Sequence, residues 1–352
     1  MRFTYLDGIR GMAALFVLAH HWNSFFSYPF VKSYLAVDLF FLLSGFVIAH
    51  AYDRKLRGGA ITPGGFMRIR FARLYPLYLL SVVLSTALVV VRSLRAAQPE
   101  SPLIDWFIGG ALALLFVPFH VGGTNSVFAM NGAYWSLSQE MLVNLLYAYT
   151  RRVVNNTLLV VIVGLSAAAI VLIGLTTGTI NHGYQPAFVS LAGGFARALF
   201  GIGLGMLLYS HRERFATWTR NVPAWLSFPL VAAVMMAPEA PWAFDLVGIF
   251  LILPLAVVIG SGHEPARAWQ VRGLEALGIA SYPLYLFHMP LGYVPTKVAA
   301  LIPEWQGFAA AGIACVLFFI CLQLDKSYDM PARQWLRERL QGRRVVAKPD
   351  PA

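Results

Sequence analysis

The chain has 352 residues, of which 58% are hydrophobic and only 12% are charged, and its formal net charge is +11. Soluble domains carry about 45–50% apolar and about 25% charged residues, so this chain lacks the polar surface that a water-soluble globule needs. The composition excludes a soluble enzyme, a disordered chain and a nucleic-acid-binding module. It predicts an integral membrane protein whose excess of Lys and Arg marks cytoplasmic loops.

Eleven apolar segments are candidates for membrane helices, which need about 20 mostly apolar residues. They lie near residues 9–28, 34–52, 74–91, 103–119, 132–150, 156–177, 188–209, 222–237, 242–260, 273–293 and 306–324. The connections are short, and neither a repeat nor an inserted soluble domain is visible. We therefore expect one membrane domain over residues 1–325 and a basic cytoplasmic tail over residues 326–352.

The basic connections predict the topology of the chain in the membrane. Arg-rich stretches occur in residues 53–73, 151–152, 212–220, 267–272 and the tail. Two segments separate successive basic stretches after residue 151, which places those stretches on one side. Three segments lie between residues 73 and 151, so one segment within 74–150 is expected to be re-entrant or broken. The predicted fold class is all-α, a polytopic bundle of about ten transmembrane helices plus that segment, with both termini cytoplasmic.

Arg10 and His21 are expected on one face of the first membrane helix. Their spacing of eleven residues corresponds to nearly whole turns and a rise of about 16 Å. A guanidinium at the cytoplasmic boundary suits a phosphate group, and an imidazole deeper on the same wall suits proton transfer. The pair predicts a groove that holds an anion at its rim and reacts at depth. The alternative is that Arg10 reaches lipid headgroups and His21 bonds to a neighbouring helix.

Segment 132–150 carries a polar stripe that begins beside Trp135. Its polar side chains recur at three- to four-residue spacing: Ser136, Glu140, Asn144 and Tyr147. Residues at this spacing share one face of a helix. A carboxylate in such a stripe can orient an imidazole or bind a substrate hydroxyl, which favours a functional role. The alternative is a seam of hydrogen bonds between membrane helices.

Arg70 and Arg73 stand three residues apart just before an apolar segment. They are neighbours on a helix surface, and two converging guanidinium groups can clamp phosphates in a bidentate manner. Anchoring by positive charge at the cytoplasmic membrane surface is the simpler explanation of the pair, and the residues alone favour it.

Several further polar residues fall within apolar segments, where an ionisable side chain costs about 2.5–3.5 kcal/mol and is a functional hypothesis by default. Arg197 is expected to pair with a buried carboxylate, either Asp38 or Glu140, and the partner of Asp245 cannot be read. His288 stays open between an acceptor-side and a structural role. Small residues predict close helix packing at Gly45, Gly201 and Gly205. No metal motif, phosphate-binding loop or dinucleotide fingerprint occurs in the sequence.

Five motifs taken together resemble the acyltransferase 3 family of membrane O-acyltransferases. They are the opening stretch Tyr5–Ala14 with Arg10 and His21, Asp38–Phe46, Arg70–Arg73, Tyr134–Glu140 and Ser281–Pro290. The motifs occur in family order and run over essentially the whole chain, which resembles the stand-alone type without an added periplasmic domain.

The resemblance implies an acetyl-CoA or other acyl-CoA donor on the cytoplasmic side and transfer to a hydroxyl of a surface or exported glycan at the bacterial inner membrane. Because the sequence has no metal motif, we expect no metal cofactor. Carried over by position, the essential histidine is His21, the donor-binding arginines are Arg10, Arg70 and Arg73, and the catalytic carboxylate is Glu140. From the residues themselves, we expect supporting or substrate-binding roles for Asp38, Trp135, Ser136, Arg197 and His288. We expect His21 to act as general base, with a transient acyl-histidine as the variant mechanism.

Two other classes of function compete with an enzyme. Intramembrane charges and a broken helix are also typical of a secondary transporter or flippase, although no inverted repeat is visible. A non-catalytic subunit of a polysaccharide export machine would use the polar stripes only for binding. The identity of the acceptor, and any periplasmic or export-system partner that presents it, stay open.

Overall fold

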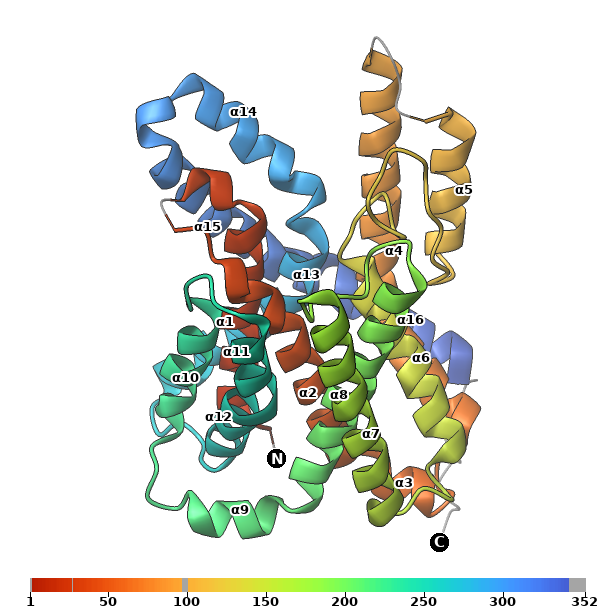
Figure 1. Ribbon diagram of the computed structural model, residues 1–352, viewed down its shortest axis with the longest axis vertical. Helices are drawn as coiled ribbons and strands as arrows, with labels where there is room; N and C mark the ends of the chain where they lie inside the picture. Colours follow the sequence, from red (N-terminus) through yellow and green to blue (C-terminus); the bar gives the residue numbers. More distant parts are fainter. Residues whose placement is uncertain (1, 27, 97–100, 342–352) are drawn as a thin grey trace, which may run out of the picture.

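The computed structural model describes residues 2–26, 28–96 and 101–341, which are overwhelmingly helical (Figure 1). The α-helices are α1 (Thr4–His21), α2 (Ala36–Ile48), α3 (Arg54–Arg57), α4 (Pro63–Arg95), α5 (Leu103–Ala113), α6 (Tyr134–Thr150), α7 (Asn156–Thr177), α8 (Phe188–Ser210), α9 (Arg212–Trp218), α10 (Ser227–Met235), α11 (Trp242–Val247), α12 (Leu253–Ser261), α13 (Ala268–Phe287), α14 (Tyr293–Leu301), α15 (Gln306–Leu324) and α16 (Met330–Gln341). No strand occurs in these three ranges; one isolated bridge joins Phe119 and Phe128.

Six helical spans are long and apolar enough to cross a membrane. They are Val31–Arg57, Pro63–Arg95, Asn156–Thr177, Phe188–Ser210, Trp242–Ser261 and Pro303–Leu340. The predicted all-α membrane fold is therefore confirmed, whereas the count of about ten crossings stays a prediction. Helices α1, α6 and α13 do not meet the criteria of length and apolarity that define these six spans.

Helix α5 is the part of residues 74–150 that departs from a simple crossing. Its eleven residues rise about 16 Å, which is about half of the roughly 30 Å thickness of a hydrocarbon core. A long loop to α6 follows, and protein groups bind its backbone and side chains. Ser138 donates to the carbonyl of Phe116 at 2.7 Å, and the Asn131 amide donates to the carbonyl of Leu286 at 2.8 Å. Helix α5 is too short to cross the core by itself.

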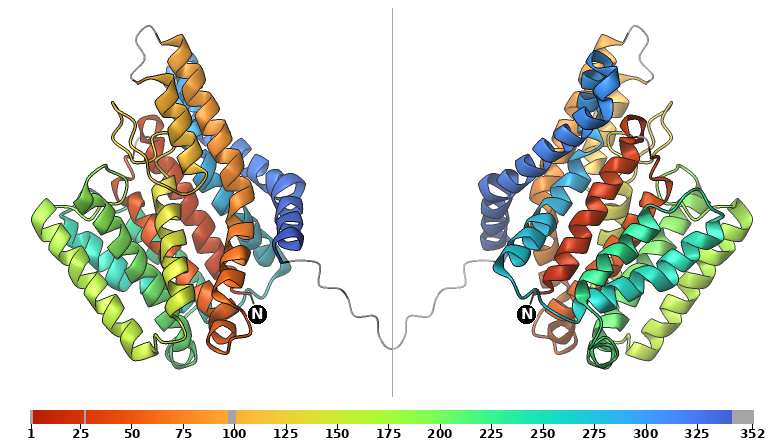
Figure 2. Two further views of the ribbon diagram at one scale, coloured as in Figure 1. Left: turned by 90° about the vertical axis from the view of Figure 1, so that its right-hand side faces the viewer. Right: turned by 90° about the vertical axis from the view of Figure 1, so that its left-hand side faces the viewer.

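The closest helix contacts pair α1 with α13 and α2 with α8, and α7 covers the other side of α8 (Figure 2). Small residues allow the contact between α2 and α8. A Cβ added at Gly45 would lie 2.0 Å from the carbonyl oxygen of Ile202, and one at Gly205 would lie 2.1 Å from that of Leu42. The two backbones therefore touch, as the small residues of the sequence predict.

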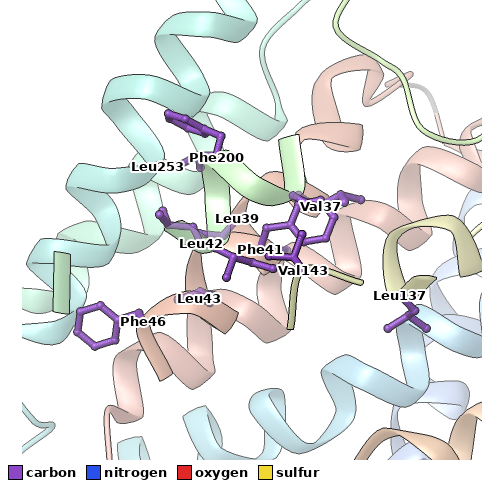
Figure 3. Close-up of a cluster of buried hydrophobic side chains, with 14 of the residues drawn as sticks. Val37, Leu39, Phe41, Leu42, Leu43, Phe46, Leu137, Val143, Phe200 and Leu253 are labelled. Atoms are coloured by element: carbon purple, nitrogen blue, oxygen red, sulfur yellow. The ribbon is translucent and has the colours of Figure 1, made fainter. Parts of the chain in front are cut away.

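A cluster of buried apolar side chains surrounds α2 (Figure 3). Leu39, Phe41 and Phe46 project from α2, while Phe200 of α8 and Leu253 of α12 reach the same cluster, and each is at most 6% exposed. Tight packing of this kind fixes α2, so the polar side chains on α2 have defined neighbours.

The strongest polar link in this core joins α2 to α8. Arg197 donates to both carboxylate oxygens of Asp38, from Nε at 3.0 Å and from Nη2 at 2.6 Å, and both side chains are buried. The guanidinium also lies 5.4 Å from the ring centre of Trp135 and 5.6 Å from that of Tyr34. The sequence leaves Asp38 and Glu140 as alternative partners of Arg197, and the structure selects Asp38.

Asp245 also has a buried counterion. Lys32 lies 2.8 Å from one carboxylate oxygen, and the hydroxyl of Tyr34 donates to the other at 2.7 Å. Tyr34 therefore contacts both buried ion pairs. A carboxylate in an apolar interior requires a partner of this kind.

The predicted tail begins within a continuous helical span. A π-helical turn, Asp325–Asp329, joins α15 to α16, and α16 packs on α4. The side chain of Arg68 on α4 donates to the carbonyl of Leu340 at 2.8 Å. Residues 326–341 therefore form part of the bundle, whereas residues 342–352 lie outside the described residues.

The basic connections gather at one end of the bundle, here called the basic end. Figure 1 shows α3, α9 and the N-terminus at that end. Arg151, between α6 and α7, pairs with Asp53 beside α3, and Arg2 pairs with Glu275 near the start of α13 at 2.7 Å. This arrangement agrees with the charge pattern on which the predicted topology rests.

Substituting Gly205→Ala should lower the stability of the protein. The added methyl group collides with the backbone of α2, and overpacking of this kind costs about 1–3 kcal/mol. The thermal unfolding midpoint in detergent measures the effect. Gly164→Ala on α7 is the matched control because a Cβ there meets no atom within 4 Å. An equal midpoint for both variants would contradict the close contact.

Substituting Asp38→Asn should be more damaging because it leaves the Arg197 charge buried without a counterion. Removing one partner of a buried ion pair costs about 3–5 kcal/mol. We expect a lower unfolding midpoint, and partial recovery in Asp38→Leu combined with Arg197→Met. Glu213→Gln removes the exposed carboxylate that pairs with Arg212 and should leave the midpoint unchanged.

Candidate functional site

A cavity of about 440 Å³ lies among α1, α2, α4, α6, α13 and the C-terminal helical segment. Five arginines line it: Arg2, Arg10, Arg70, Arg73 and Arg333. Three carboxylates line it too: Asp7, Glu140 and Asp325. Because cations outnumber carboxylates and several of these residues come from the basic end, we call this space the basic cavity. It is suited to an anion that carries more than one charge.

The wall of the basic cavity becomes apolar away from the basic end. Val37, Phe40 and Phe41 contribute from the first part of α2, and Leu137 and Tyr285 contribute from α6 and α13. The rings of Phe40 and Tyr285 meet edge to face, with their centres 5.4 Å apart. The cavity therefore combines a cationic region with an apolar region.

Arg10 and Arg70 are held by protein groups. Arg10 donates to Asp7 at 2.7 Å and to the hydroxyl of Ser281 at 3.1 Å. Arg70 pairs with Glu140 at 2.5 Å, and the hydroxyl of Ser44 donates to the same carboxylate oxygen. These bonds fix the direction of each guanidinium before any ligand arrives.

Arg73 differs from its neighbours on the cavity wall. In the described part of the chain no hydrogen bond or ion pair reaches its guanidinium, while the positive charges of Arg70, Arg10 and Arg333 oppose it. A partly buried arginine among like charges lacks the counterion that such a group needs. An incoming anion would supply it.

The polar side chains along α6 do not all face the cavity. Ser136 and Glu140 line the cavity, and Ser136 shares a hydrogen bond of 2.6 Å with the hydroxyl of Tyr285. Tyr147 donates to Asp53 at 2.9 Å instead. The contacts of Glu140 are with Arg70 and Ser44, so this carboxylate orients a cation rather than an imidazole.

His21 is the last residue of α1, and its side chain is exposed. Its Nδ1 lies 2.9 Å from the carbonyl oxygen of Val17. A carbonyl only accepts hydrogen bonds, so Nδ1 carries the proton of the neutral ring and Nε2 is free to accept one. This is the tautomer that a general base requires.

His288 lies against His21, with ring centres 4.7 Å apart. The ring of His288 is 1% exposed, and its Nδ1 lies 2.9 Å from the carbonyl oxygen of Tyr285. Its Nε2 is buried and has no hydrogen-bond partner among the residues placed by the structure. The ring centres of His288 and Tyr285 are 5.9 Å apart. Tyr285 thus connects the basic cavity to the pair of histidines.

The predicted single groove from Arg10 to His21 stays a prediction. Arg10 lines the basic cavity, whereas His21 is not among the described residues that do. The structure divides the predicted site residues into three groups. The first is Arg10, Arg70, Arg73, Ser136 and Glu140 at the cavity; the second is His21 with His288; the third is Asp38, Arg197 and Trp135 in the core between α2, α6 and α8.

His182 lies in the connection between α7 and α8, beside this third group. Its carbonyl accepts a hydrogen bond of 2.8 Å from Arg197. Burial lowers the pKa of the His182 imidazole, and the nearby charge of Arg197 lowers it further. A neutral ring here avoids a second positive charge next to the buried arginine.

The cavity residues that were missed at the sequence level include Arg2, His50, Asp325 and Arg333. His50 ends the apolar part of its segment and shares a bond of 2.9 Å with the hydroxyl of Tyr209. Arg333 pairs with Asp329 four residues earlier. That spacing is a helix signal, and it could have shown that the predicted tail continues the helix.

No cluster of three or more metal-ligating side chains is found among the residues that the structure describes.

The sequence matches a protein-family profile and several known proteins. The profile of the acyltransferase domain, Acyl_transf_3, matches residues 3–324. Protein 2 in the picA locus of Rhizobium radiobacter is 45% identical over 182 residues, which cover 49% of this chain and 93% of that protein. Exopolysaccharide production protein ExoZ of Rhizobium meliloti (strain 1021) is 26% identical over 328 residues, which cover 88% of this chain and 92% of that protein.

A third relative matches a shorter part of the chain. Acyltransferase MdmB of Streptomyces mycarofaciens is 33% identical over 166 residues, which cover 44% of this chain and 41% of that protein. No solved structure matches the chain. Because the family profile extends over nearly all of the helical bundle, including the cavity residues of α1, α2, α4, α6 and α13, the chain belongs to the acyltransferase 3 family.

Proposed function

We propose that this membrane acyltransferase moves a short acyl group, acetyl in the first instance, from acyl-CoA to a hydroxyl of a surface or exported glycan. The observation that carries the proposal is the basic cavity, in which Arg73 has no counterion among the described residues while the neighbouring Arg10 and Arg70 are held in place. Coenzyme A is a polyanion on a long flexible arm, so its phosphates fit the cationic region. The apolar region beyond fits the arm.

Within this proposal the arginines have unequal roles. Arg73 makes the first phosphate contact because an anion there gains a cation without breaking an existing ion pair. Arg70 is positioned by Glu140, and Arg10 by Asp7. Guanidinium groups that are already oriented lose little freedom on binding, which favours affinity.

His21 is the proposed general base. Its Nε2 takes the proton of the acceptor hydroxyl while the hydroxyl oxygen forms a bond to the acyl carbon. The carbon–sulfur bond of the thioester breaks, and the proton then passes to the CoA thiolate, which leaves as the thiol. His288 supports this step by packing on His21. General-base catalysis by a positioned side chain contributes about 10²–10⁴-fold.

The basic end is assigned to the cytoplasm in this proposal. Lys and Arg are retained on the cytoplasmic side of a bacterial inner membrane, and the donor is a cytoplasmic metabolite. This orientation places both termini in the cytoplasm and the histidine pair toward the opposite face. The name of the exopolysaccharide production relative supports a glycan acceptor on that face.

Substituting His21→Ala should reduce acyl transfer by about 10²–10⁴-fold because the proton acceptor is lost. Purified protein in liposomes, supplied with labelled acetyl-CoA and a glycan acceptor, provides the measurement. His211→Ala is the matched control: its Nδ1 contacts a carbonyl four residues earlier at 3.0 Å, as in His21, but its side chain is exposed at the basic end. Transfer by His21→Ala at the rate of the unsubstituted protein would refute the assignment.

Substituting Arg73→Gln should raise the KM for the acyl donor by about tenfold to a hundredfold and change kcat much less. A charge-assisted hydrogen bond contributes about 1.5–3 kcal/mol, and about 1.4 kcal/mol corresponds to a factor of ten. The initial rate of transfer as a function of acetyl-CoA concentration gives both constants. Arg57→Gln, at an exposed position of α3, should leave both unchanged; an unchanged KM in Arg73→Gln would exclude the proposed contact.

A further inference from the structure

The C-terminal helical segment contributes two side chains to the basic cavity, Asp325 and Arg333. The family match ends at residue 324, immediately before this segment. Two hydrogen bonds attach the segment to α4, which carries Arg70 and Arg73. Tyr328 donates to the carbonyl of Pro76 at 3.1 Å, and Arg68 donates to that of Leu340 at 2.8 Å.

The π-helical turn explains how Asp325 and Arg333 face the same space. Residues eight apart point about 80° apart in a regular α-helix. A turn closed by i to i+5 hydrogen bonds contains one extra residue, which reduces this angle to about 20°. Such turns occur often at functional sites. Here the turn aims Arg333 into the cavity beside Asp325.

Arg333 is positioned rather than neutralised. Its Nη2 pairs with Asp329, whose side chain is 0% exposed, while the Arg333 side chain stays 25% exposed. Its Nε is buried and has no hydrogen-bond partner within the residues that the structure places. The exposed part of this side chain lines the cavity and can meet an acceptor that enters it. Across the cavity it adds to the positive charge around Arg73.

We propose that Arg333, held by Asp329, is a phosphate-binding residue of the donor site, so that the C-terminal helix α16 completes the acyl-CoA pocket. This inference rests on the proposed function and names a residue beyond the family match. The ligand group is a phosphate of the nucleotide end of CoA, because the cations meet there and the arm lies in the apolar region. Arg333 and Arg73 approach that group from adjacent helices.

The test measures binding rather than turnover. Full-length protein in detergent is titrated by calorimetry with CoA and with pantetheine, which has the same arm but no phosphate. Arg333→Gln should weaken CoA binding by about tenfold to a hundredfold and leave pantetheine binding unchanged. Arg337→Gln, one turn further along α16 and exposed, should bind both ligands as the unsubstituted protein does.

Three outcomes would overturn the inference, and one of them also overturns the proposed function. Equal CoA affinity in Arg333→Gln and the unsubstituted protein removes the contact. Equal loss of CoA and pantetheine affinity indicates a structural effect instead. No CoA binding by the unsubstituted protein refutes the proposed donor, and the inference with it. If Arg333→Gln does not fold, Arg333→Met decides: it retains the apolar stem but removes the charge, and CoA affinity equal to that of the unsubstituted protein would refute the contact.

Discussion

The pairing of buried charges governs the architecture of this protein. An ionised side chain in an apolar interior is tolerated only with a counterion and satisfied hydrogen bonds. Arg197 meets Asp38, Lys32 meets Asp245, and Arg70 meets Glu140. Each pair joins helices that are distant in the sequence, so the charges also select which helices become neighbours. Among the cavity arginines, Arg73 lacks a counterion within the part of the chain that the structure describes, and this unpaired charge points to a ligand.

The sequence predicts local helical features of this fold well. The eleven-residue spacing of Arg10 and His21 fits one continuous helix, which the structure contains as α1. Gly45 and Gly205 predict close packing because a small residue has one main use at a helix interface. Such features follow from the period of a single helix, or from the size of one side chain, and need no knowledge of the neighbours.

Features that depend on the neighbours could not be predicted in this way. The neighbours of the two residues in the predicted groove differ, because Arg10 lines the basic cavity whereas His21 packs against His288. The partners of Glu140 lie on α2 and α4, which periodicity within α6 does not reveal. The segment after residue 325 is polar enough to read as a tail, and only its contacts with α4 show that it belongs to the bundle.

The division between the cationic cavity and the histidine pair has a chemical consequence for the proposed reaction. A guanidinium beside His21 would oppose its protonation, because two positive charges at short distance repel each other. The phosphates of the donor, however, require several guanidinium groups close together. Phe40 and Tyr285 belong to the apolar lining of the basic cavity, and the ring centre of Tyr285 lies 5.9 Å from that of His288. A donor with a long uncharged arm along this lining can satisfy both requirements at once.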